Sequence, residues 1–379
     1  MKNAILKFLI IGLMTQSYAV SSFAQSVGPL DLDQLQIMVD SGKLSEDQYN
    51  DYVDLLESGG ETAIIQPPAE RVFENQDEAN MATDDSVKDV GSVTNIAELQ
   101  NFSDKQVAGY GNWAFQFVYI SKADGSRKVL TARNMNNQVR PASTMKLFTS
   151  SLAFDLGTYT NSVNLTKMLQ HSVNGMADKA LRSTTTASKY SGFTIPSGSY
   201  LKSSELLGYR MYDSTEGKSQ IIDATIIKGC AIMKDAYKNL EDSSKFHPVN
   251  GSGLQSSAKD SDLTENKVTA RLETALLERI LANKAKYNQY KKYLPTPGGS
   301  GTLAARFKQS RSLAKIYAKT GTLGTTKALA GFAETAKGTI VFSVIGDRLK
   351  GVSVKQAMSG QIENLIAAHI KYIRAQEAK

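Results

Sequence analysis

The sequence predicts an α/β fold in which an antiparallel sheet has helices packed on both of its sides. Five segments are rich in apolar, β-branched and aromatic residues, which is typical of strands. They are residues 113–121, 128–132, 315–318, 328–333 and 339–345. The last three follow one another with only short turns between them, so we expect them to form an antiparallel meander.

Helices are expected where apolar residues recur with a helical spacing. Residues 147–154 form an apolar segment that should run into the core, and residues 355–375 should form a closing helix. Residues 156–161 have the composition of a turn between two helices. Residues 183–245 begin with a Ser/Thr/Gly-rich half that we expect to be exposed, and residues 221–240 should be helical.

The N-terminal residues have the pattern of a signal peptide. Lys2 and Lys7 precede an apolar run at residues 8–14. Residues 22–24 have the small-x-small form of a cleavage site. The apolar run is too short for a membrane span, so we expect cleavage near Ala24 and a periplasmic chain, with an uncleaved anchor as the alternative. No cysteine follows the apolar run, which excludes a lipoprotein anchor at that point. Residues 1–24 are therefore assigned to the signal peptide.

The part of the chain that follows is strongly acidic. Residues 25–92 hold 16 acidic and 3 basic residues, a net charge of −13, whereas residues 93–379 carry +18. We expect residues 25–60 to form a small acidic helical hairpin and residues 61–94 to be a disordered acidic linker. Such a hairpin buries little apolar surface alone, so residues 28–58 should either self-associate or dock on a protein, or serve only as a spacer.

The cysteine and histidine content excludes several kinds of site. The single cysteine, Cys230, allows no intrachain disulfide and no cysteine-based metal cluster, and we expect it to be a small buried hydrophobe. His171, His247 and His369 are scattered and there is no Gly-x-Ser-x-Gly motif, which argues against a Ser-His-Asp mechanism. The lysines of the basic part are dispersed, so nucleic acid is not an expected partner, and an anionic polymer fits better.

Three short motifs occur in order along the chain. They are Ser143-Thr144-Met145-Lys146, Ser172-Val173-Asn174 and Lys319-Thr320-Gly321. A serine hydroxyl is a weak nucleophile and needs a base, which a lysine can be if its ammonium is destabilised. Positions i and i+3 share a helix face, so Ser143 and Lys146 should lie side by side. Burial and a second cation, Lys319, are expected to lower the pKa of Lys146, which makes it the preferred base.

The second and third motifs supply groups that could handle a peptide substrate. Ser172 can relay a proton toward a leaving amine, and Asn174 can hold a substrate amide through its carbonyl and amino groups.

Lys319 and Thr320 precede Gly321 on an expected edge strand, and with Thr322 they offer a cation and hydroxyls suited to the carboxylate of a peptide C-terminus. The backbone N–H groups of Ser143 and Thr322 are expected to form an oxyanion hole.

Each motif alone has a structural alternative. Ser-x-x-Lys on an amphipathic helix is common by chance and then marks a solvated face, and Ser-x-Asn is no more specific. Lys-Thr-Gly alone is more often a strand end or a turn, since Thr favours strands and Gly favours turns. The context favours the catalytic interpretation, because Pro141-Ala142 and an apolar helix flank the first motif and three expected strands surround the third.

The motifs and their surroundings resemble one enzyme family. The residues that carry the resemblance are 141–147, 168–174 with Ala177, Leu181 and Arg182, 250–254, 294–295, 301–303 with Arg306 and Phe307, 319–323, and 329–332. They are similar to the D-alanyl-D-alanine carboxypeptidase/endopeptidase family, the class C low-molecular-mass penicillin-binding proteins. This resemblance implies a β-lactamase/DD-peptidase-like (serine transpeptidase-like) fold for a catalytic domain at residues 95–379.

The chain departs from the family pattern at three places. Val173 and Asn250 each stand where the family usually has Asp, which removes two carboxylates that would help to fix loop geometry and puts the rate in doubt. Only 25 residues separate Lys146 from Ser172, where many members carry large inserted domains. The resemblance thus implies a compact member with an unusually open cleft.

The resemblance also implies a function. It is that of a serine-type D-Ala-D-Ala carboxypeptidase, a DD-endopeptidase, or both, acting on peptidoglycan stem peptides through an acyl-enzyme on Ser143 and inhibited by β-lactam antibiotics. No metal or organic cofactor is implied. Two alternatives stay open: a β-lactamase, which needs a well-placed group for fast deacylation, and a non-catalytic peptidoglycan-binding or adaptor protein.

Overall fold

The structure is a computed structural model, and it describes residues 93–159, 161–212, 219–254, 263–308 and 310–379. The chain divides into two compact units, Met1–Ile64 and Ile65–Lys379, and every described residue belongs to the second. The expectations for the signal peptide, the acidic hairpin and nearly all of the acidic linker therefore lie outside the described residues. None of the helices in the described part is long and apolar enough to cross a membrane.

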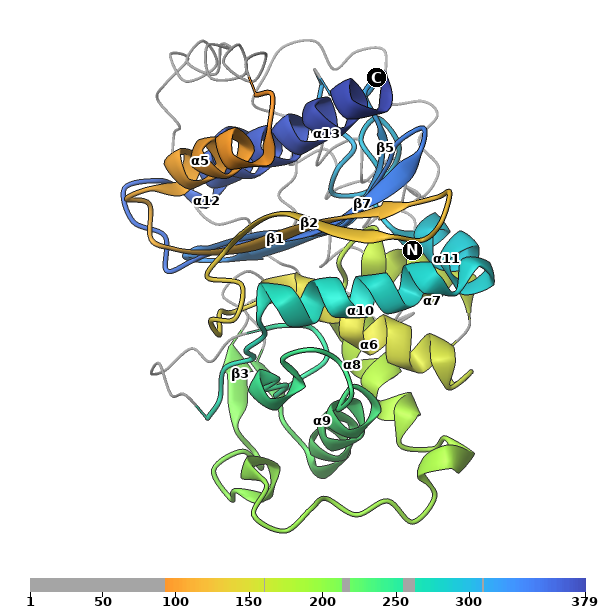
Figure 1. Cartoon of the computed structure of the whole chain (residues 1–379). Coiled ribbons are helices and arrows are strands. Elements are labelled where there is room, and N and C mark those ends of the chain that lie inside the picture. Colours follow the sequence, from red (N-terminus) through yellow and green to blue (C-terminus); the bar gives the residue numbers. More distant parts are fainter. Residues whose placement is uncertain (1–92, 160, 213–218, 255–262, 309) are drawn as a thin grey trace, which may run out of the picture. The chain divides into compact units, whose positions relative to one another are not determined.

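A five-stranded antiparallel sheet organises the second unit (Figure 1). Its strands, in the spatial order β2-β1-β7-β6-β5, are β2(Arg127–Arg133), β1(Asn112–Ser121), β7(Gly338–Asp347), β6(Thr326–Glu334) and β5(Lys315–Leu323). All five expected strands are found, and the last three form the expected meander. Strand β5, which carries the third motif, lies at one edge of the sheet as predicted.

Helices cover both faces of the sheet, which confirms the predicted arrangement (Figure 1). Alternation along β1 shows how one strand serves two cores: Phe115 and Phe117 pack on the side of the C-terminal helix, whereas Ala114 and Val118 pack on the side of the first motif. The C-terminal helix is confirmed and includes a π-helical segment. The elements that flank the sheet are α5(Ile96–Val107), η3(Ala142–Thr144), α6(Met145–Asp155), α7(Ser162–Leu169), α8(Asn174–Thr184), η4(Ser188–Tyr190), η5(Tyr200–Lys202), α9(Ala224–Ala236), η6(Ser243–Lys245), α10(Ala270–Ala282), α11(Lys284–Tyr290), η7(Lys291–Tyr293), α12(Val354–Gln356), η8(Ala357–Ile362) and α13(Glu363–Glu377), with a separate hairpin of β3(Arg210–Tyr212) and β4(Ser219–Ile221).

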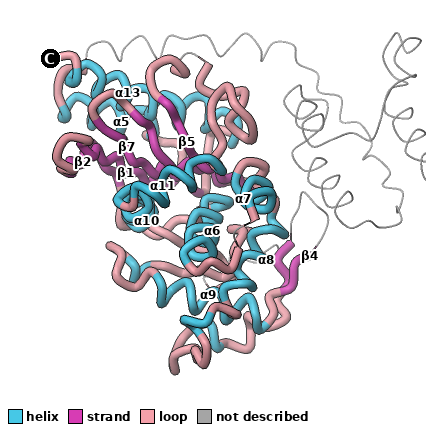
Figure 2. Tube along the Cα trace, turned by 90° about the vertical axis from the view of Figure 1, so that its right-hand side faces the viewer, coloured by secondary structure: helices cyan, strands magenta, loops and turns pink. Residues whose placement is uncertain are grey.

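Helix α6, which follows the first motif, is surrounded by other elements. Every residue from Met145 to Ala153 is buried, and α6 packs against α7, α8 and α9 (Figure 2). A helix buried on all sides must pair its own polar side chains. Thr149 does so by donating to the Gly251 carbonyl at 2.8 Å, and Ser150 by donating to the Lys146 carbonyl at 2.6 Å.

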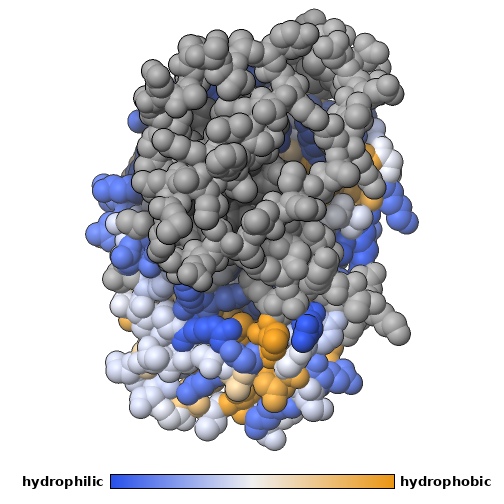
Figure 3. Space-filling model, turned by 180° about the vertical axis from the view of Figure 1, so that it is seen from behind, coloured by the Kyte–Doolittle hydropathy of each residue, from blue (hydrophilic) through white to orange (hydrophobic). Residues whose placement is uncertain are grey.

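The expectation of an exposed first half at residues 183–245 is wrong for several side chains. Tyr190, Leu201, Leu206 and Met211 are buried in the core on the side of α6. These four apolar residues are widely spaced among Ser, Thr and Gly and have no regular period. Neither composition nor periodicity therefore predicts that they are buried. Other side chains of this segment face solvent, such as Leu207 and Ile221. Figure 3 shows a group of apolar side chains on the described part of the molecular surface seen from behind.

The helix expected at 221–240 is shorter than predicted. Ile221 belongs to β4, and the helix begins after Asp223, whose carboxylate accepts from the backbone N–H groups of Thr225 and Ile226, both at 2.9 Å. This side chain is an N-cap, and it fixes the first turn of α9 at Ala224. Cys230 within α9 is buried, as predicted.

A buried histidine joins α13 to the sheet. The His369 ring stacks on Phe117 with centroids 3.6 Å apart, its Nδ1 lies 2.6 Å from the Leu365 carbonyl, and its Nε2 lies 2.6 Å from Thr131 Oγ1. A neutral ring can donate at Nδ1 and accept at Nε2, so both nitrogens are satisfied. Burial lowers the pKa of His369 to about 3, against the opposing effect of the Leu365 bond.

A buried carboxyl group joins α10 to β7. Glu273 is fully buried, and its Oε2 accepts from Ser343 Oγ at 2.6 Å. Its other oxygen, Oε1, has no hydrogen-bond partner among the described residues. Burial raises the pKa of Glu273 to about 7, although the hydroxyls of Ser343 and Thr144 act in the opposite direction.

Glu273→Gln should therefore change how stability depends on pH. A raised folded-state pKa favours folding below the unfolded value of 4.5, and this contribution is lost as the pH rises through about 7. The difference in unfolding free energy between the variant and the wild type should grow by about 2–3 kcal/mol in the variant's favour from pH 5 to pH 8.5. Urea unfolding at the two pH values measures it. A difference that does not change with pH would contradict the assignment of a titrating carboxyl here.

Candidate active site

The first motif begins in a tight turn and continues into α6. Ser143 lies in the 3₁₀ turn η3, where Ala142 has a left-handed backbone with φ 51°, and Lys146 lies in the first turn of α6. Lys146 Nζ is 3.0 Å from Ser143 Oγ. The expected side-by-side placement of Ser143 and Lys146 is confirmed, although the serine precedes the α-helix and does not lie within it.

Lys146 is fully buried and is surrounded by acceptors from the second motif. Its Nζ donates to Ser172 Oγ at 3.0 Å, to Asn174 Oδ1 at 2.7 Å and to the Ser172 carbonyl. Ser172 has a left-handed backbone with φ 61°, which turns both its carbonyl and its hydroxyl toward the lysine. Strained backbone of this kind is concentrated at functional sites.

The third motif meets the first and second motifs at the hydroxyl of Ser172. Lys319 is also fully buried, and its Nζ donates to Ser172 Oγ at 2.8 Å and to the Thr320 carbonyl at 2.9 Å. Residues from three distant parts of the chain therefore converge on Ser172 Oγ. That oxygen has two lone pairs for the two ammonium donors, so its own proton can be donated elsewhere.

Asn174 lies beside Lys146, and its Oδ1 accepts from Lys146 Nζ at 2.7 Å. An amide oxygen has two lone pairs, so this bond is compatible with the expected contact to a substrate amide. Asn174 is buried at the N-terminal end of α8. Its carbonyl oxygen therefore positions Lys146.

The edge of the site contains two residues that the sequence reasoning did not assign to it. Thr320 Oγ1 donates to Thr302 Oγ1 at 2.8 Å, and the Thr302 N–H donates to the Gln170 carbonyl at 3.1 Å, two residues before Ser172. Lys327 Nζ donates to Thr322 Oγ1 at 2.6 Å. Thr302 belongs to the family resemblance at 301–303, which was the available signal for it, whereas Lys327 is recognisable only from the strand register.

Two glycines let the backbone approach the turn at Ala142–Thr144 that carries Ser143. Gly253 has φ 85°, and a Cβ there would overlap the carbonyl of Ala142. A Cβ on Gly321 would lie 2.7 Å from the Pro141 carbonyl, which is closer than real Cβ atoms come. The loop before residue 254 and strand β5 therefore both pack directly on the turn that carries Ser143.

Asn250 holds the loop that ends in Gly253. Its Oδ1 accepts from the N–H groups of Ser252 at 3.1 Å and Gly253 at 2.8 Å, and its amino group donates to the Leu254 carbonyl at 3.0 Å. The amino group of Asn266 donates to the same carbonyl at 3.0 Å. An amide therefore fixes this loop in the position where the family usually has a carboxylate.

Asp178 supports the same loop from α8. Its Oδ1 accepts from the Gly251 N–H at 3.1 Å, and its side chain is buried. Burial raises the pKa of Asp178 to about 6, whereas the Gly251 bond and the nearby cations Arg182 and Lys146 act in the opposite direction. Nothing in the motif search pointed to Asp178.

A buried ion-pair cluster lies just before the turn that carries Ser143. Arg140 Nε donates to Asp347 Oδ1 at 2.7 Å, Nη2 donates to Thr325 Oγ1 at 2.9 Å, and Nη1 lies 3.6 Å from Glu265. Asp347 also accepts from Thr326 Oγ1 at 2.8 Å. The cluster ties the residues before Ser143 to the turn between β5 and β6, so it sets where the third motif lies relative to the first.

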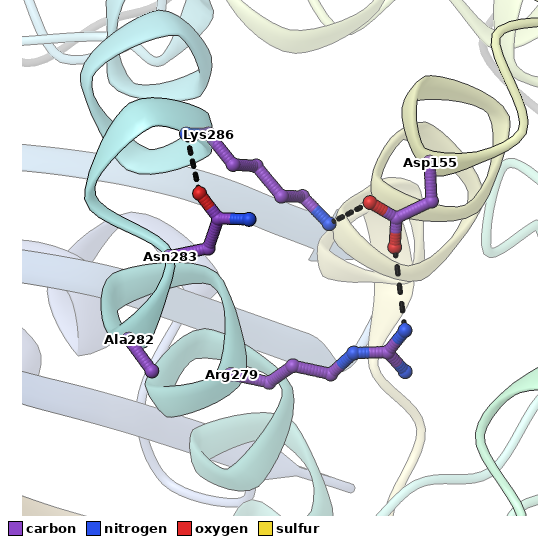
Figure 4. Close-up of a pocket in the computed structure, with 5 residues that line it drawn as sticks. All are labelled: Asp155, Arg279, Ala282, Asn283 and Lys286. Atoms are coloured by element: carbon purple, nitrogen blue, oxygen red, sulfur yellow. Dashed lines mark hydrogen bonds and ion pairs between the residues drawn. The ribbon is translucent and has the colours of Figure 1, made fainter.

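A pocket of about 380 Å³ lies at the opposite end of α6, roughly 16 Å along the helix from its first residue (Figure 4). Asp155 lies 2.5 Å from Lys286 Nζ and 3.5 Å from Arg279. Asn283 faces the same space and caps α11. The carboxylate balances one of the two cations, and the pocket is far from Ser143, so we assign it no role in the chemistry.

Gly253→Ala should displace the turn that carries Ser143. The variant forces a methyl group into the Ala142 carbonyl at a backbone angle that alanine adopts poorly, which should cost about 2–4 kcal/mol of stability. If the chain reacts with β-lactams as the resemblance implies, the fraction that remains folded should react with penicillin at least about 10-fold more slowly than the wild type. Thermal unfolding and labelling rates measure the two effects. Gly360→Ala is the control, because nothing lies within 4 Å of its added Cβ; equal labelling of the two variants would contradict the role given to Gly253.

Comparisons with solved structures give likenesses at low identity. Penicillin binding protein 4 of Haemophilus influenzae is 21% identical over 55% of this chain and 39% of that chain, with a TM-score of 0.37. A D-alanyl-D-alanine carboxypeptidase of Mycobacterium tuberculosis is 16% identical over 71% and 95%, with a TM-score of 0.40. A beta-lactamase of Burkholderia ambifaria is 13% identical over 73% and 98%, with a TM-score of 0.39. The chain thus spans about two fifths of the Haemophilus protein.

Comparison with family models gives one match, while comparison with curated proteins gives none. The match is to the D-Ala-D-Ala carboxypeptidase 3 (S13) family and covers residues 242–368. That segment contains the loop at 250–254 and the third motif, and it does not reach Ser143 or Ser172. Over residues 242–368 the chain matches the S13 family, and for this segment, which holds the loop at 250–254 and the third motif, the predicted family resemblance is confirmed.

Proposed function

We propose that the protein is a serine-type DD-peptidase that cleaves D-Ala-D-Ala-terminated stem peptides of peptidoglycan through an acyl-enzyme. The observation that carries the proposal is the convergence of Lys146 and Lys319 on Ser172 Oγ, with Ser143 Oγ 3.0 Å from Lys146. The match of residues 242–368 to a D-Ala-D-Ala carboxypeptidase family supports the choice of substrate.

Acylation begins with Ser143. As its Oγ attacks the scissile carbonyl carbon, its proton passes to the neutral amine of Lys146, which is already within hydrogen-bond distance. Full burial and the second cation across Ser172 favour that neutral amine. The developing oxyanion is stabilised by the backbone N–H groups of Ser143 and Thr322.

The leaving amine needs a proton, and Ser172 is placed to deliver it. Lys146 donates to Ser172 Oγ, so a proton taken up by the lysine can move onto this oxygen as the hydroxyl proton moves to the amine. Lys319 stabilises the negative charge that builds on Ser172 Oγ during this transfer. D-Ala or a cross-linking amine then departs, and water hydrolyses the acyl-enzyme by the same groups in reverse.

The finer assignments are part of this proposal. We propose carboxypeptidase activity, endopeptidase activity, or both, because only 25 residues separate Lys146 from Ser172 and leave no room there for a large inserted domain. We also propose that the protein is exported to the periplasm with cleavage near Ala24. Residues 28–58 would then provide self-association or protein docking.

The first test is incubation of the mature protein with a fluorescent penicillin, followed by mass spectrometry of the labelled peptide. We expect one stable adduct on Ser143, because β-lactams mimic the D-Ala-D-Ala peptide and leave an ester that is slow to hydrolyse. Ser143→Ala should give no adduct, and the exposed Ser188→Ala should label as the wild type does. Pentapeptides and cross-linked muropeptides then separate carboxypeptidase from endopeptidase activity.

Other outcomes of this experiment favour the alternatives. Rapid turnover of nitrocefin without a stable adduct would indicate a β-lactamase. Folded protein that neither labels nor hydrolyses, while Ser143→Ala still binds peptidoglycan, would indicate a non-catalytic binding protein. The carboxyls of Asp178 and Glu273 are engaged by Gly251 and Ser343, so the structure gives no reason to prefer a β-lactamase.

Lys146→Arg tests the base. The guanidinium keeps the positive charge but is not deprotonated in proteins, so it cannot accept the Ser143 proton. Acylation by penicillin should fall by about 10²- to 10⁴-fold. Lys286→Arg is a matched control, since Lys286 is also a buried lysine that donates to a serine of α6, Ser151 at 3.0 Å. If both variants acylate at the wild-type rate, Lys146 is not the base.

A further inference from the structure

A buried carboxyl group of α10 lies beside the turn that carries Ser143. Glu273 is fully buried, and its Oε2 accepts from Ser343 Oγ at 2.6 Å, while Oε1 has no hydrogen-bond partner among the described residues. Thr144, the residue after Ser143, is also fully buried, and its hydroxyl lowers the pKa of Glu273 against the effect of burial. The Thr144 hydroxyl is therefore within reach of a carboxyl that the proposed reaction does not use.

The other polar side chains around this carboxyl bond to one another. Ser343 of β7 and Gln116 of β1 are direct partners in the antiparallel register, so they lie on the same face of the sheet. Gln116 Oε1 accepts from Thr274 Oγ1 at 2.5 Å, and its amino group lies 3.4 Å from Met135 Sδ. Among these groups, Thr144 is thus the one that can pair with Glu273 Oε1.

Thr144 also holds the turn that carries Ser143. Its Oγ1 donates to the Pro141 carbonyl at 2.8 Å, and its N–H donates to the same carbonyl at 3.3 Å. A Cβ added to Gly321 would lie 2.7 Å from this carbonyl, so strand β5 packs directly on it. The Thr144 bonds therefore fix a carbonyl at which the first and third motifs meet.

The two protonation states of Glu273 differ in what they ask of Thr144. A hydroxyl has one proton and two lone pairs, so Thr144 can accept from a neutral carboxyl and still donate to the Pro141 carbonyl. An ionised carboxylate only accepts, so it competes with that carbonyl for the single hydroxyl proton. Hydrogen bonds to a charged acceptor are the stronger ones. Ionisation of Glu273 therefore draws the Thr144 hydroxyl away from the turn.

No charged side chain needs to take part in this competition. Besides burial, which raises the pKa of Glu273 to about 7, the hydroxyls of Ser343 and Thr144 are the groups that shift it. On α10 itself, Arg271 is paired with Glu241. The titratable side chains of the strands that pack on α10, and of the helix that follows Thr144, are bonded to other groups; they are Tyr119, Lys327, Glu334, Asp347 and Lys146.

We propose, on the basis of the function proposed above, that Glu273 is a positioning residue whose neutral form holds the Ser143 turn through Thr144 and the Pro141 carbonyl. Ionisation of Glu273 loosens the turn and slows acylation. The carboxyl thereby gives the enzyme an upper pH limit. This limit acts against the loss of the Lys146 proton, which favours acylation as the pH rises.

The test is the ratio of second-order acylation rate constants with penicillin, Glu273→Gln over the wild type, for the full mature protein between about pH 5.5 and pH 8.5. Glutamine keeps a donor and an acceptor at every pH, so it imitates the neutral carboxyl. The ratio should be close to one at the low pH, begin to rise near the Glu273 pKa of about 7, and reach about 5- to 10-fold at the high pH. Effects of Lys146 are common to both proteins and cancel.

Two further variants check the route. Glu278→Gln makes the same change on the same helix, at a glutamate paired with Arg127 at 2.7 Å, and its ratio to the wild type should not change with pH. Thr144→Val removes the hydroxyl through which Glu273 acts, so its ratio to the wild type should also rise with pH, whatever its value at low pH. Thr144→Ser keeps the hydroxyl and should keep the pH profile of the wild type. The Thr144 variants decide the matter if Glu273→Gln does not fold.

The outcomes separate this assignment from the proposed function. A wild type that is acylated, with ratios for Glu273→Gln and Thr144→Val that stay constant or fall as the pH rises, overturns the role of Glu273 and leaves the DD-peptidase proposal standing. A wild type whose labelled fraction decreases at high pH while its rate constant is unchanged has lost folded protein only, which also overturns that role. A wild type that is not acylated at any pH overturns both proposals.

Discussion

The bonds from two buried lysine nitrogens to the hydroxyl of Ser172 are the constraint on which the rest of the site depends. Lys146 comes from the central helix and Lys319 from the edge strand, and their nitrogens lie 3.0 and 2.8 Å from the same oxygen. Burying an unpaired cation costs several kcal/mol, and positive charge on both nitrogens beside one oxygen would be repulsive, which agrees with the neutral amine proposed for Lys146. Each lysine therefore needs further acceptors. Lys146 has Asn174 and the Ser172 carbonyl, and Lys319 has the Thr320 carbonyl.

The requirement for acceptors around the two lysines determines much of the conformation of the surrounding backbone. Ser172 offers its hydroxyl and its carbonyl to Lys146 from a left-handed conformation, and Ala142 adopts a similar conformation just before Ser143. Such conformations cost free energy and persist only when neighbouring contacts fix them. Gly253 packs against the Ala142 carbonyl. Arg140, two residues before Ala142, donates to Asp347 and so fixes the chain that leads into the turn. The glycine and the buried ion pair thus hold the strained turn from two sides.

The fold and the three motifs were predictable because local patterns determine them. Strand β7 is apolar on both faces and each motif has a fixed short spacing, so neither requires knowledge of distant contacts. Residues such as Asp178 and Arg140 act through partners more than 70 positions away, and no local pattern marks them. Lys327 is similar, since its closeness to Thr322 depends on the register of two strands.

The replacement of a family carboxylate by Asn250 is also explained by these contacts. The Leu254 carbonyl receives two amide donors, one from Asn250 and one from Asn266, at 3.0 Å each. An aspartate at position 250 would place a carboxylate oxygen against that carbonyl, because an ionised carboxylate only accepts. The bonds that Asn250 and Asn266 make to the Leu254 carbonyl join neutral groups and do not change with pH, whereas the bond from the Gly251 N–H goes to Asp178, a carboxyl whose pKa burial raises to about 6. Asp178 accepts from the Gly251 N–H of the same loop, so a carboxyl from α8 still supports this loop although Asn250 stands where the family usually has Asp.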